Sequence, residues 1–498
     1  MDVFANLAYG LSVAGTPDNL LFCFIGVLLG TLIGVLPGLG PTATVAMLLP
    51  ITFFLPPTGA IIMLAGIFYG AQYGGSTTAI LVKLPGESSS VVTCLDGYAM
   101  AQQGRAGAAL AIAALGSLFA GCVTAVVIAI AGPPLAEIAI LFGPAEYVAL
   151  LTLGVIGAVV LASGSLPKAI AMVLLGLLIG CIGTDLTSGE KRLTFEITAL
   201  YDGIGFVPLA MGMFGLAEVI FGLEETGSRG RPTAAITRLW PTRQDFKDAW
   251  PASTRGTLLG IVLGVLPGSG ATLASFASYA LEKKIARDPS KFGTGAVQGL
   301  AGPESANNAA AQACFIPMLS LGVPPNAIMA LMIGALMIQG IQPGPTVITS
   351  QPELFWGMIA SMLIGNVMLV LLNLPLIGLW VKLLRVPYAL LFPVILVFCA
   401  IGTYSLNNSV FEVGLMAGFG VLGYTLRKLN CEMAPLMLGF VVGPMLEENI
   451  RRTMLTSNGD PSVFVTRPIA ATMFALTALL LLSMLLPSLS RKREMLAE

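Results

Sequence analysis

The segment Gly34-Val35-Leu36-Pro37-Gly38-Leu39-Gly40 interrupts a long apolar stretch, and it recurs 230 residues later as Gly264-Val265-Leu266-Pro267-Gly268-Ser269-Gly270. Compared over residues 30–42 and 260–272, the two copies share eight of thirteen positions. Proline removes a backbone donor, and glycine permits backbone angles that other residues avoid. Each copy therefore predicts a break in a helix, at matching places in two halves of the chain.

The residues around these breaks carry very little charge. Of the 498 residues, 56% are hydrophobic and 10% are charged, whereas a soluble domain carries about 25% charged residues. No charged residue lies between Asp18 and Lys83, or between Glu304 and Glu353. A membrane helix needs about 20 apolar residues, and many windows approach that length. The sequence predicts an all-α polytopic membrane protein with about 11–13 transmembrane segments, because no soluble fold could bury so much apolar surface.

One polar segment divides the chain. It is rich in Arg, Lys, Asp, Glu and Pro, which predicts a first transmembrane half at 1–222, a cytoplasmic polar linker at 223–254 and a second transmembrane half at 255–498. Lys and Arg flank the second copy of the repeated motif, but none precedes Lys83 in the first half. Short loops rich in Lys and Arg stay cytoplasmic, so the two halves are expected to form an inverted repeat.

The repeated motif suggests a binding site. A helix broken inside the membrane exposes N–H groups that carry partial positive charge and attract carboxylates. Paired broken helices in two halves are a pointer to a transporter's binding site. Ordinary kinks or close glycine packing are the alternative. The expected substrate contacts in the two copies are Gly38, Gly40, Thr42, Gly268, Gly270 and Thr272.

Residues 69–98 read as a re-entrant hairpin with a polar tip. Its glycines would let the backbone approach a ligand, and its hydroxyl groups would lie at a helix N-terminus. An interfacial loop whose hydroxyls bond to their own backbone is the alternative. Lys83 could contact an anionic substrate or pair with Glu87. The candidate substrate contacts here are Gly74, Gly75, Ser76, Thr77, Thr78 and Lys83.

The second half offers polar residues at the edge of an uncharged stretch. Glu304 could bind Na⁺ or carry H⁺, since an ionisable group at membrane depth is a functional hypothesis by default; a solvated position at the interface is the alternative. Ser305 and Asn326 join it as candidates for ion coupling, and Asn307 and Asn308 as candidates for substrate binding. A weaker correspondence relates 74–78 and 85–87 of the first half to 302–308, Pro317 and 322–325 of the second, without an alignment residue by residue.

Several function classes are disfavoured. The chain has no histidine, so a zinc protease with an H-E-x-x-H motif is excluded, and no metal or cofactor site is expected. The isolated Asp202 does not provide the two facing aspartates of an intramembrane aspartyl protease, so we expect no enzyme. A net charge of −1 without a basic cluster argues against nucleic-acid binding. No phosphate-binding loop is present, which argues against ATP as the energy source.

As a set, these segments resemble the large membrane subunit of the bacterial tripartite tricarboxylate transporters. The resemblance covers most of the chain and is carried by residues 34–41, 73–81, 85–87, 90–93, 96–98, 103–107, 303–309 and 316–324.

This resemblance implies a multi-pass permease of the bacterial inner membrane. It implies two protein partners, a small membrane subunit of about four helices and a periplasmic binding protein. It also implies a small tri- or dicarboxylate substrate such as citrate, and coupling to a Na⁺ or H⁺ gradient with alternating access. A channel or scaffold subunit, or an intramembrane enzyme, are the competing functions.

Overall fold

The structure is a computed structural model that describes residues 3–36, 39–161, 165–185, 188–224, 239–268, 270–383 and 388–484. Helices dominate these residues, which confirms the all-α class predicted from the sequence. The elements up to residue 224 are α1 (Val3–Ala14), α2 (Pro17–Gly34), α3 (Pro41–Leu48), η1 (Leu49–Phe54), α4 (Pro57–Val82), η2 (Ser88–Ser90), α5 (Thr93–Met100), η3 (Ala101–Arg105), α6 (Ala106–Ile140), α7 (Pro144–Leu161), α8 (Leu166–Gly180), β1 (Gly183–Thr184), β2 (Lys191–Arg192), η4 (Thr198–Leu200), α9 (Phe206–Ala210), η5 (Met211–Leu216) and α10 (Ala217–Glu224).

In the second part of the chain, the regular elements of the described residues are helices joined by loops. Its elements are α11 (Arg243–Gly264), α12 (Gly270–Ile285), η6 (Pro289–Lys291), α13 (Val297–Ala313), α14 (Phe315–Leu321), α15 (Ala327–Ile338), α16 (Val347–Ser350), α17 (Pro352–Asn373), α18 (Ile377–Leu383), α19 (Tyr388–Asn407), α20 (Val410–Lys428), α21 (Met433–Thr456), α22 (Val463–Thr466) and α23 (Pro468–Met484). The strands β1 and β2 form a small antiparallel pair with Gly183 opposite Arg192.

Several helices are suited to a membrane. Within the described ranges, five helical stretches are long and apolar enough to cross one, and seven shorter apolar helices of 10–17 residues accompany them. The five are Pro17–Gly34, Thr93–Ile140, Phe206–Glu224, Pro352–Asn373 and Val410–Lys428. These lengths agree with a multi-pass membrane protein, and the number of crossings stays a prediction.

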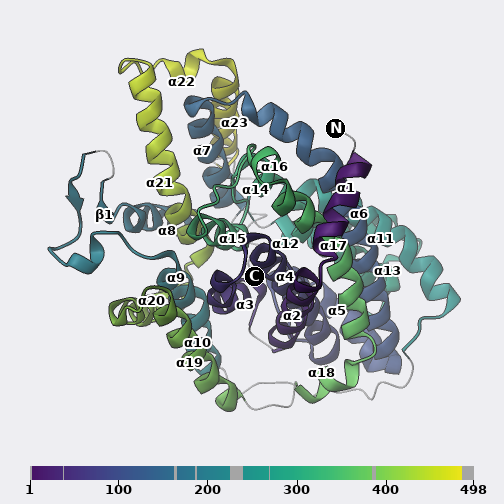
Figure 1. Cartoon of the computed structure of the whole chain (residues 1–498). Helices are drawn as coiled ribbons and strands as arrows, with labels where there is room; N and C mark the ends of the chain where they lie inside the picture. The colour runs from purple at the N-terminus through teal and green to yellow at the C-terminus, as the bar shows by residue number, and fades with distance from the viewer. Residues whose placement is uncertain are drawn as a thin grey trace.

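Two helices form the centre of the molecule, α4 from the first half and α13 from the second. Every residue of α4 from Gly59 to Val82 is buried, and α13 is buried along nearly its whole length. Helix α2 packs along α4, and α11 packs along α13 (Figure 1). Helices that are buried on all sides normally lack polar residues. The polar side chains that α4 and α13 carry therefore call for partners inside the protein.

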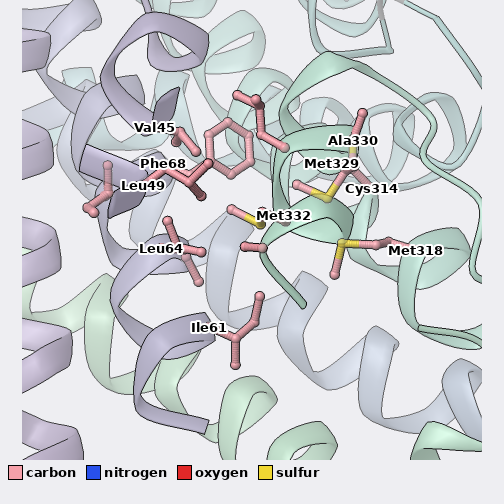
Figure 2. Close-up of a cluster of buried hydrophobic side chains, with 14 of the residues drawn as sticks. Val45, Leu49, Ile61, Leu64, Phe68, Cys314, Met318, Met329, Ala330 and Met332 are labelled. Atoms are coloured by element: carbon pink, nitrogen blue, oxygen red, sulfur yellow. The ribbon is translucent and has the colours of Figure 1, made fainter. Parts of the chain in front are cut away.

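A hydrophobic cluster joins the two halves. Figure 2 shows Leu64 and Phe68 of α4 on one side of it, and Met318 of α14 with Met329 and Met332 of α15 on the other. All five side chains are 2% exposed or less. Unbranched methionines fill irregular gaps between helices, which suits a contact between elements of different halves.

The structure adds detail to two segments that the sequence singled out. Residues 225–238 of the expected linker lie outside the described residues, but 243–254 already form the first turns of α11. A capping box at Thr242 and Asp245 starts this helix, so it begins before residue 255. The hairpin expected at 69–98 also turns later than its glycines suggested. Its tip is at 83–92, because α4 continues unbroken to Val82.

Candidate functional site

Broken segments from both halves line one cavity of about 550 Å³. In the first half, the break between α2 and α3 contributes Gly40 and Thr42 to its wall. In the second half, the break between α11 and α12 contributes Gly268, Gly270 and Thr272. The two copies of the repeated motif, far apart in sequence, therefore meet at a single concave site.

Local sequence explains the break in the second half. Helix α11 ends at Gly264, and Gly268 has φ of 107°, a conformation that favours glycine. Its backbone N–H donates to the carbonyl oxygen of Pro325 at 2.7 Å. In the first half, α3 begins at Pro41, where the missing N–H of proline is tolerated at the first helical position.

A second pair of breaks reaches the same cavity. The residue that follows α4, Lys83, has φ of 59°, and the residue that follows α14, Gly322, has φ of 71°, both in the left-handed region. Four residues later, Glu87 and Asn326 are both extended, with φ of −154° and −152°. Glu87 and Asn326 both line the cavity. The segment 83–87 thus corresponds to 322–326.

Glycine contacts support this pairing of the halves. A Cβ on Gly34 would lie 2.5 Å from Cα of Ala71, and one on Gly264 would lie 2.5 Å from Cα of Ala310. The equivalent contacts one turn earlier join Gly30 to Ile67 and Gly260 to Ala306. The offset is 230 residues on α2 and α11, but 239 on α4 and α13. These contacts supply the residue-by-residue alignment that the sequence left open, in which Pro85 matches Pro324.

Helix N-termini dominate the electrostatics of the cavity. Helices α3, α12, α15 and α21 all contribute residues from their first turn to its wall: Pro41, Gly270, Ala327 and Ala434. The N-terminus of a helix carries about half a positive charge and exposes unpaired N–H groups. Four such ends around one cavity favour an anionic ligand.

Charged side chains also line the cavity. Glu87, Glu218 and Glu432 contribute carboxylates, and Arg427 contributes a guanidinium. Arg427 forms an ion pair with Glu218 of α10, and its guanidinium carbon lies 3.8 Å from the ring centroid of Phe221. The cavity wall therefore offers both a cation and hydrogen-bond acceptors.

A second, buried polar site lies between α4, α5 and α13. Glu304 is 1% exposed, and its Oε2 accepts a hydrogen bond from Ser76 at 2.8 Å. Thr93 donates its hydroxyl to Oε1 of the same carboxyl group. Among the described residues, the ion pairs do not include Glu304. A buried carboxylate without a countercharge is costly, so this group suits either a proton or a bound cation.

A small enclosed space of about 20 Å³ adjoins Glu304, and Ser76, Thr77 and Ser117 also line it. A cavity needs about 10–15 Å³ to hold one water molecule. The space beside Glu304 therefore has room for about one particle of the size of water or Na⁺, next to a carboxyl group and several hydroxyl groups.

Amide side chains connect the two sites. Asn307 donates to Oε1 of Glu87 at 3.2 Å and accepts from Gln72 at 2.8 Å. Because Glu87 lines the large cavity and Asn307 lies one helical turn from Glu304, the buried site and the cavity belong to one polar network. Asn308 extends it by donating to Ser117 at 2.7 Å.

Comparison with known proteins matches residues 20–438 to the family model described as "Tripartite tricarboxylate transporter TctA family". The chain belongs to this family. A protein of Agrobacterium vitis described as "Uncharacterized 52.8 kDa protein in TAR-I ttuC' 3'region" is 56% identical over 494 residues, which covers 99% of this chain and 98% of that protein. A second A. vitis protein, from the TAR-II ttuC' 3'region, is 59% identical over 235 residues, which covers 47% of this chain and 97% of that protein. No solved structure matches.

TctA family membership confirms the resemblance seen in the sequence. The family is one of transporters that work in tripartite systems, with a small membrane partner and a periplasmic binding partner. Transport across a membrane is therefore the general activity, and the chain is a multi-pass membrane protein rather than a member of an enzyme family.

In this TctA-family chain, the predicted site residues fall into distinct places. The large cavity contains Gly40, Thr42, Gly268, Gly270, Thr272 and Asn326. Gly38 lies outside the described residues. The remaining candidates are not among the cavity-lining residues: Gly74, Gly75, Ser76, Thr77, Thr78, Lys83, Glu304, Ser305, Asn307 and Asn308. Which of these residues contact substrate or cation stays a prediction.

The interior of α4 corrects one expectation. Gly74, Gly75 and the three hydroxyl residues after them do not start a helix, because they lie inside α4. Gly74 packs against the backbone of Gly34, where a Cβ would lie only 2.5 Å from its carbonyl carbon. The hydroxyl groups of Thr77 and Thr78 bond to backbone carbonyls of their own helix. The Nζ atom of Lys83 lies 5.8 Å from the ring centroid of Tyr98.

Sequence reasoning missed four residues of these sites. Glu87 was treated only as a partner for Lys83, and Thr93 was not considered. Glu218 and Arg427 were not among the candidates chosen from the sequence. A pattern could have identified Glu87. It lies two residues after Pro85, which follows the end of α4, and Asn326 lies two residues after Pro324, which follows the end of α14. No local signal marks Arg427, because only the fold brings α20 to the cavity.

Proposed function

We propose that this chain is the large permease subunit of a binding-protein-dependent secondary transporter in the bacterial inner membrane. It imports citrate-like tri- or dicarboxylates together with Na⁺ or H⁺. The observation that carries the proposal is the meeting of four helix N-termini, two of them from the repeated motif, at one cavity of about 550 Å³. That volume suits a small organic acid, and the helix ends suit its carboxylates.

The proposed mechanism is alternating access. The two halves, as an inverted repeat, open the cavity to one side of the membrane and then to the other. The matching glycine contacts of α2 with α4 and of α11 with α13 support the repeat. Ser88 and Thr272, whose hydroxyl oxygens are 2.8 Å apart, join the two halves beside the cavity. In this mechanism that contact breaks when the other side opens.

The proposed coupling group is Glu304. A proton or Na⁺ beside it removes the cost of an unpaired buried carboxylate. Because Asn307 bonds to Glu87 at the cavity wall, occupancy of the buried site and of the cavity can influence each other. Reciprocal influence of this kind is what links the gradient of the cation to uptake of the substrate.

The proposed partners follow the family. A periplasmic binding protein delivers the substrate, and a small membrane subunit of about four helices packs beside this chain in the lipid bilayer. Nucleic acid and a resident cofactor have no place in the proposal.

The experiment is uptake of radiolabelled citrate, and of a panel of other carboxylates, into proteoliposomes that contain this chain with its small partner and binding protein. A Na⁺ gradient is imposed first and is then replaced by a pH gradient. Accumulation above the external concentration that requires one of the gradients supports secondary transport and names the ion. Flux that only equilibrates the carboxylate indicates a channel, and no flux under either gradient refutes the proposed substrate class.

A further inference from the structure

Arg427 differs in charge from the other ionisable side chains that line the cavity. Among the described residues that line it, Arg427 is the one basic side chain, while Glu87, Glu218 and Glu432 are acidic. It lies in the last turn of α20, on a different element from the helices whose N-termini face the cavity. A polycarboxylate in the cavity meets three acidic side chains, so a fixed cation is needed to offset their repulsion.

The surroundings of Arg427 hold its guanidinium in place without using all of its donors. Phe221 of α10 lies against its face, with 3.8 Å between the guanidinium carbon and the ring centroid. The ion pair to Glu218 runs through Nη1. A guanidinium has five N–H donors in a planar fork, which matches the two oxygens of a carboxylate. The side chain is 33% exposed, so a ligand can reach it.

Glu218 resembles a substrate carboxylate in chemistry. It is 17% exposed, lines the same cavity and holds the same guanidinium. A substrate carboxylate that approaches Arg427 therefore competes with Glu218 for one cation. When the substrate leaves, Glu218 can pair with Arg427 again, which prevents an unpaired charge in a partly buried site.

We propose that Arg427 binds one carboxylate of the transported acid, and that Glu218 occupies Arg427 when the cavity is empty. This inference rests on the proposed function, because it assigns the substrate-recognising cation of that same cavity. It predicts opposite effects for the two members of one ion pair, which a purely structural pair does not produce.

The test measures the Kd of citrate, and of the other carboxylates in the panel, for the purified full-length chain by isothermal titration. Arg427→Ala is expected to weaken binding by about ten- to a hundredfold, since the loss of hydrogen bonds to a charged group changes affinity by about that factor. Arg427→Lys keeps the charge but loses the planar fork, so an intermediate loss is expected. Glu218→Gln removes the competing carboxylate, and tighter binding is expected.

Lys428→Ala is the matched control. Lys428 is the next residue on α20, pairs with Glu224 and also lies near Phe221, but it does not line the cavity. Its substitution is expected to leave Kd unchanged. Thermal unfolding of each variant shows which variants fold. If Arg427→Ala does not fold, Glu218→Gln and Arg427→Lys still decide the test.

Two results would overturn the inference. Binding that is unchanged in the Arg427 variants, while the unmodified chain binds a carboxylate, refutes the role of Arg427 and leaves the proposed function standing. Suppose that Arg427→Ala and Glu218→Gln weaken carboxylate binding equally, and that the double variant restores it. The pair is then only structural. Failure of the unmodified chain to bind any carboxylate refutes the role of Arg427, and the uptake experiment then decides the proposed function separately.

Discussion

The hydroxyl group of Ser76 on α4 donates to the carboxyl group of Glu304 on α13 across 2.8 Å, although the two residues are 228 positions apart in sequence. This bond joins the two central helices, one from each half of the chain. Thr93 of α5 donates to the other oxygen of the same carboxyl group. The only ionisable side chain of α13 is thereby held by hydroxyl donors from the first half.

The first prediction concerns Glu304. Glu304→Gln keeps an oxygen that can accept from Ser76, so the chain is expected to fold, but it can neither carry a proton nor neutralise Na⁺. Gradient-driven uptake in proteoliposomes is expected to fall about tenfold or more, because the cation gradient can no longer act through this group. Equilibrium binding of the carboxylate by the same variant is the control. Full gradient-driven accumulation by Glu304→Gln would contradict a coupling role.

The second prediction concerns the glycines where α2 and α11 cross the central helices. Gly34→Ala and Gly264→Ala are each expected to lower the free energy of unfolding by about 1–3 kcal/mol, because a Cβ would overlap backbone atoms that cannot turn aside. Gly418→Ala on exposed α20 is the matched control, since nothing lies within 4 Å of its Cβ position. That change is expected to be neutral or stabilising. Thermal unfolding in detergent measures all three.

The third prediction concerns the contact between Ser88 and Thr272. A cysteine at each position is expected to form a disulfide under oxidation, because the present hydroxyl oxygens are 2.8 Å apart. If this contact must open during alternating access, uptake stops in the oxidised double variant and returns with a reductant. The two single-cysteine variants, each treated in the same way, control for the seven native cysteines. Undiminished uptake by the cross-linked chain would rule out separation at this point.

The fourth prediction concerns the start of α11. Burial alone would raise the pKa of Asp245, but hydrogen bonds from Thr242 and the nearby Arg105 guanidinium lower it overall. A lowered pKa means that Asp245 stabilises the fold above the ordinary Asp value of about 3.9, and that this contribution is lost as pH falls through the folded-state pKa.

Asp245→Asn is therefore expected to unfold more easily at pH 7, by about 1 kcal/mol, and to show less acid sensitivity than the unmodified chain. Unfolding temperature measured from pH 7 down to pH 3 checks the sign. Asp248→Asn on the same turn is the control, because the hydrogen bonds that the described residues show for Asp248 are exposed ones from Gln244. An equal acid response in Asp245→Asn and the unmodified chain would show that this carboxylate does not matter.

The sequence by itself determined the class of this protein and the position of its main breaks. Scarce charge and long apolar runs require a membrane setting, because exposed apolar surface of this extent has no place in water. Pro37 and Pro267, each beside a glycine, require interrupted helices whatever surrounds them, because a missing N–H and a permissive backbone are local properties. The same reasoning identified Glu304 as a singular group, since a lone carboxyl beside an uncharged stretch is visible without a fold.

Only the tertiary structure decided which polar residues meet. Gly74 and Gly75 read as a loop, but they serve close packing of α4 against the α2 break and Gly86, a role that depends on a distant segment. Arg427 was not a candidate from the sequence, and only the fold brings α20 to the cavity. Local chemistry fixes where a chain bends, whereas hydrogen bonds and ion pairs between distant side chains depend on how the helices pack. For that reason the breaks were predictable, and the partners of Glu304 and Arg427 were not.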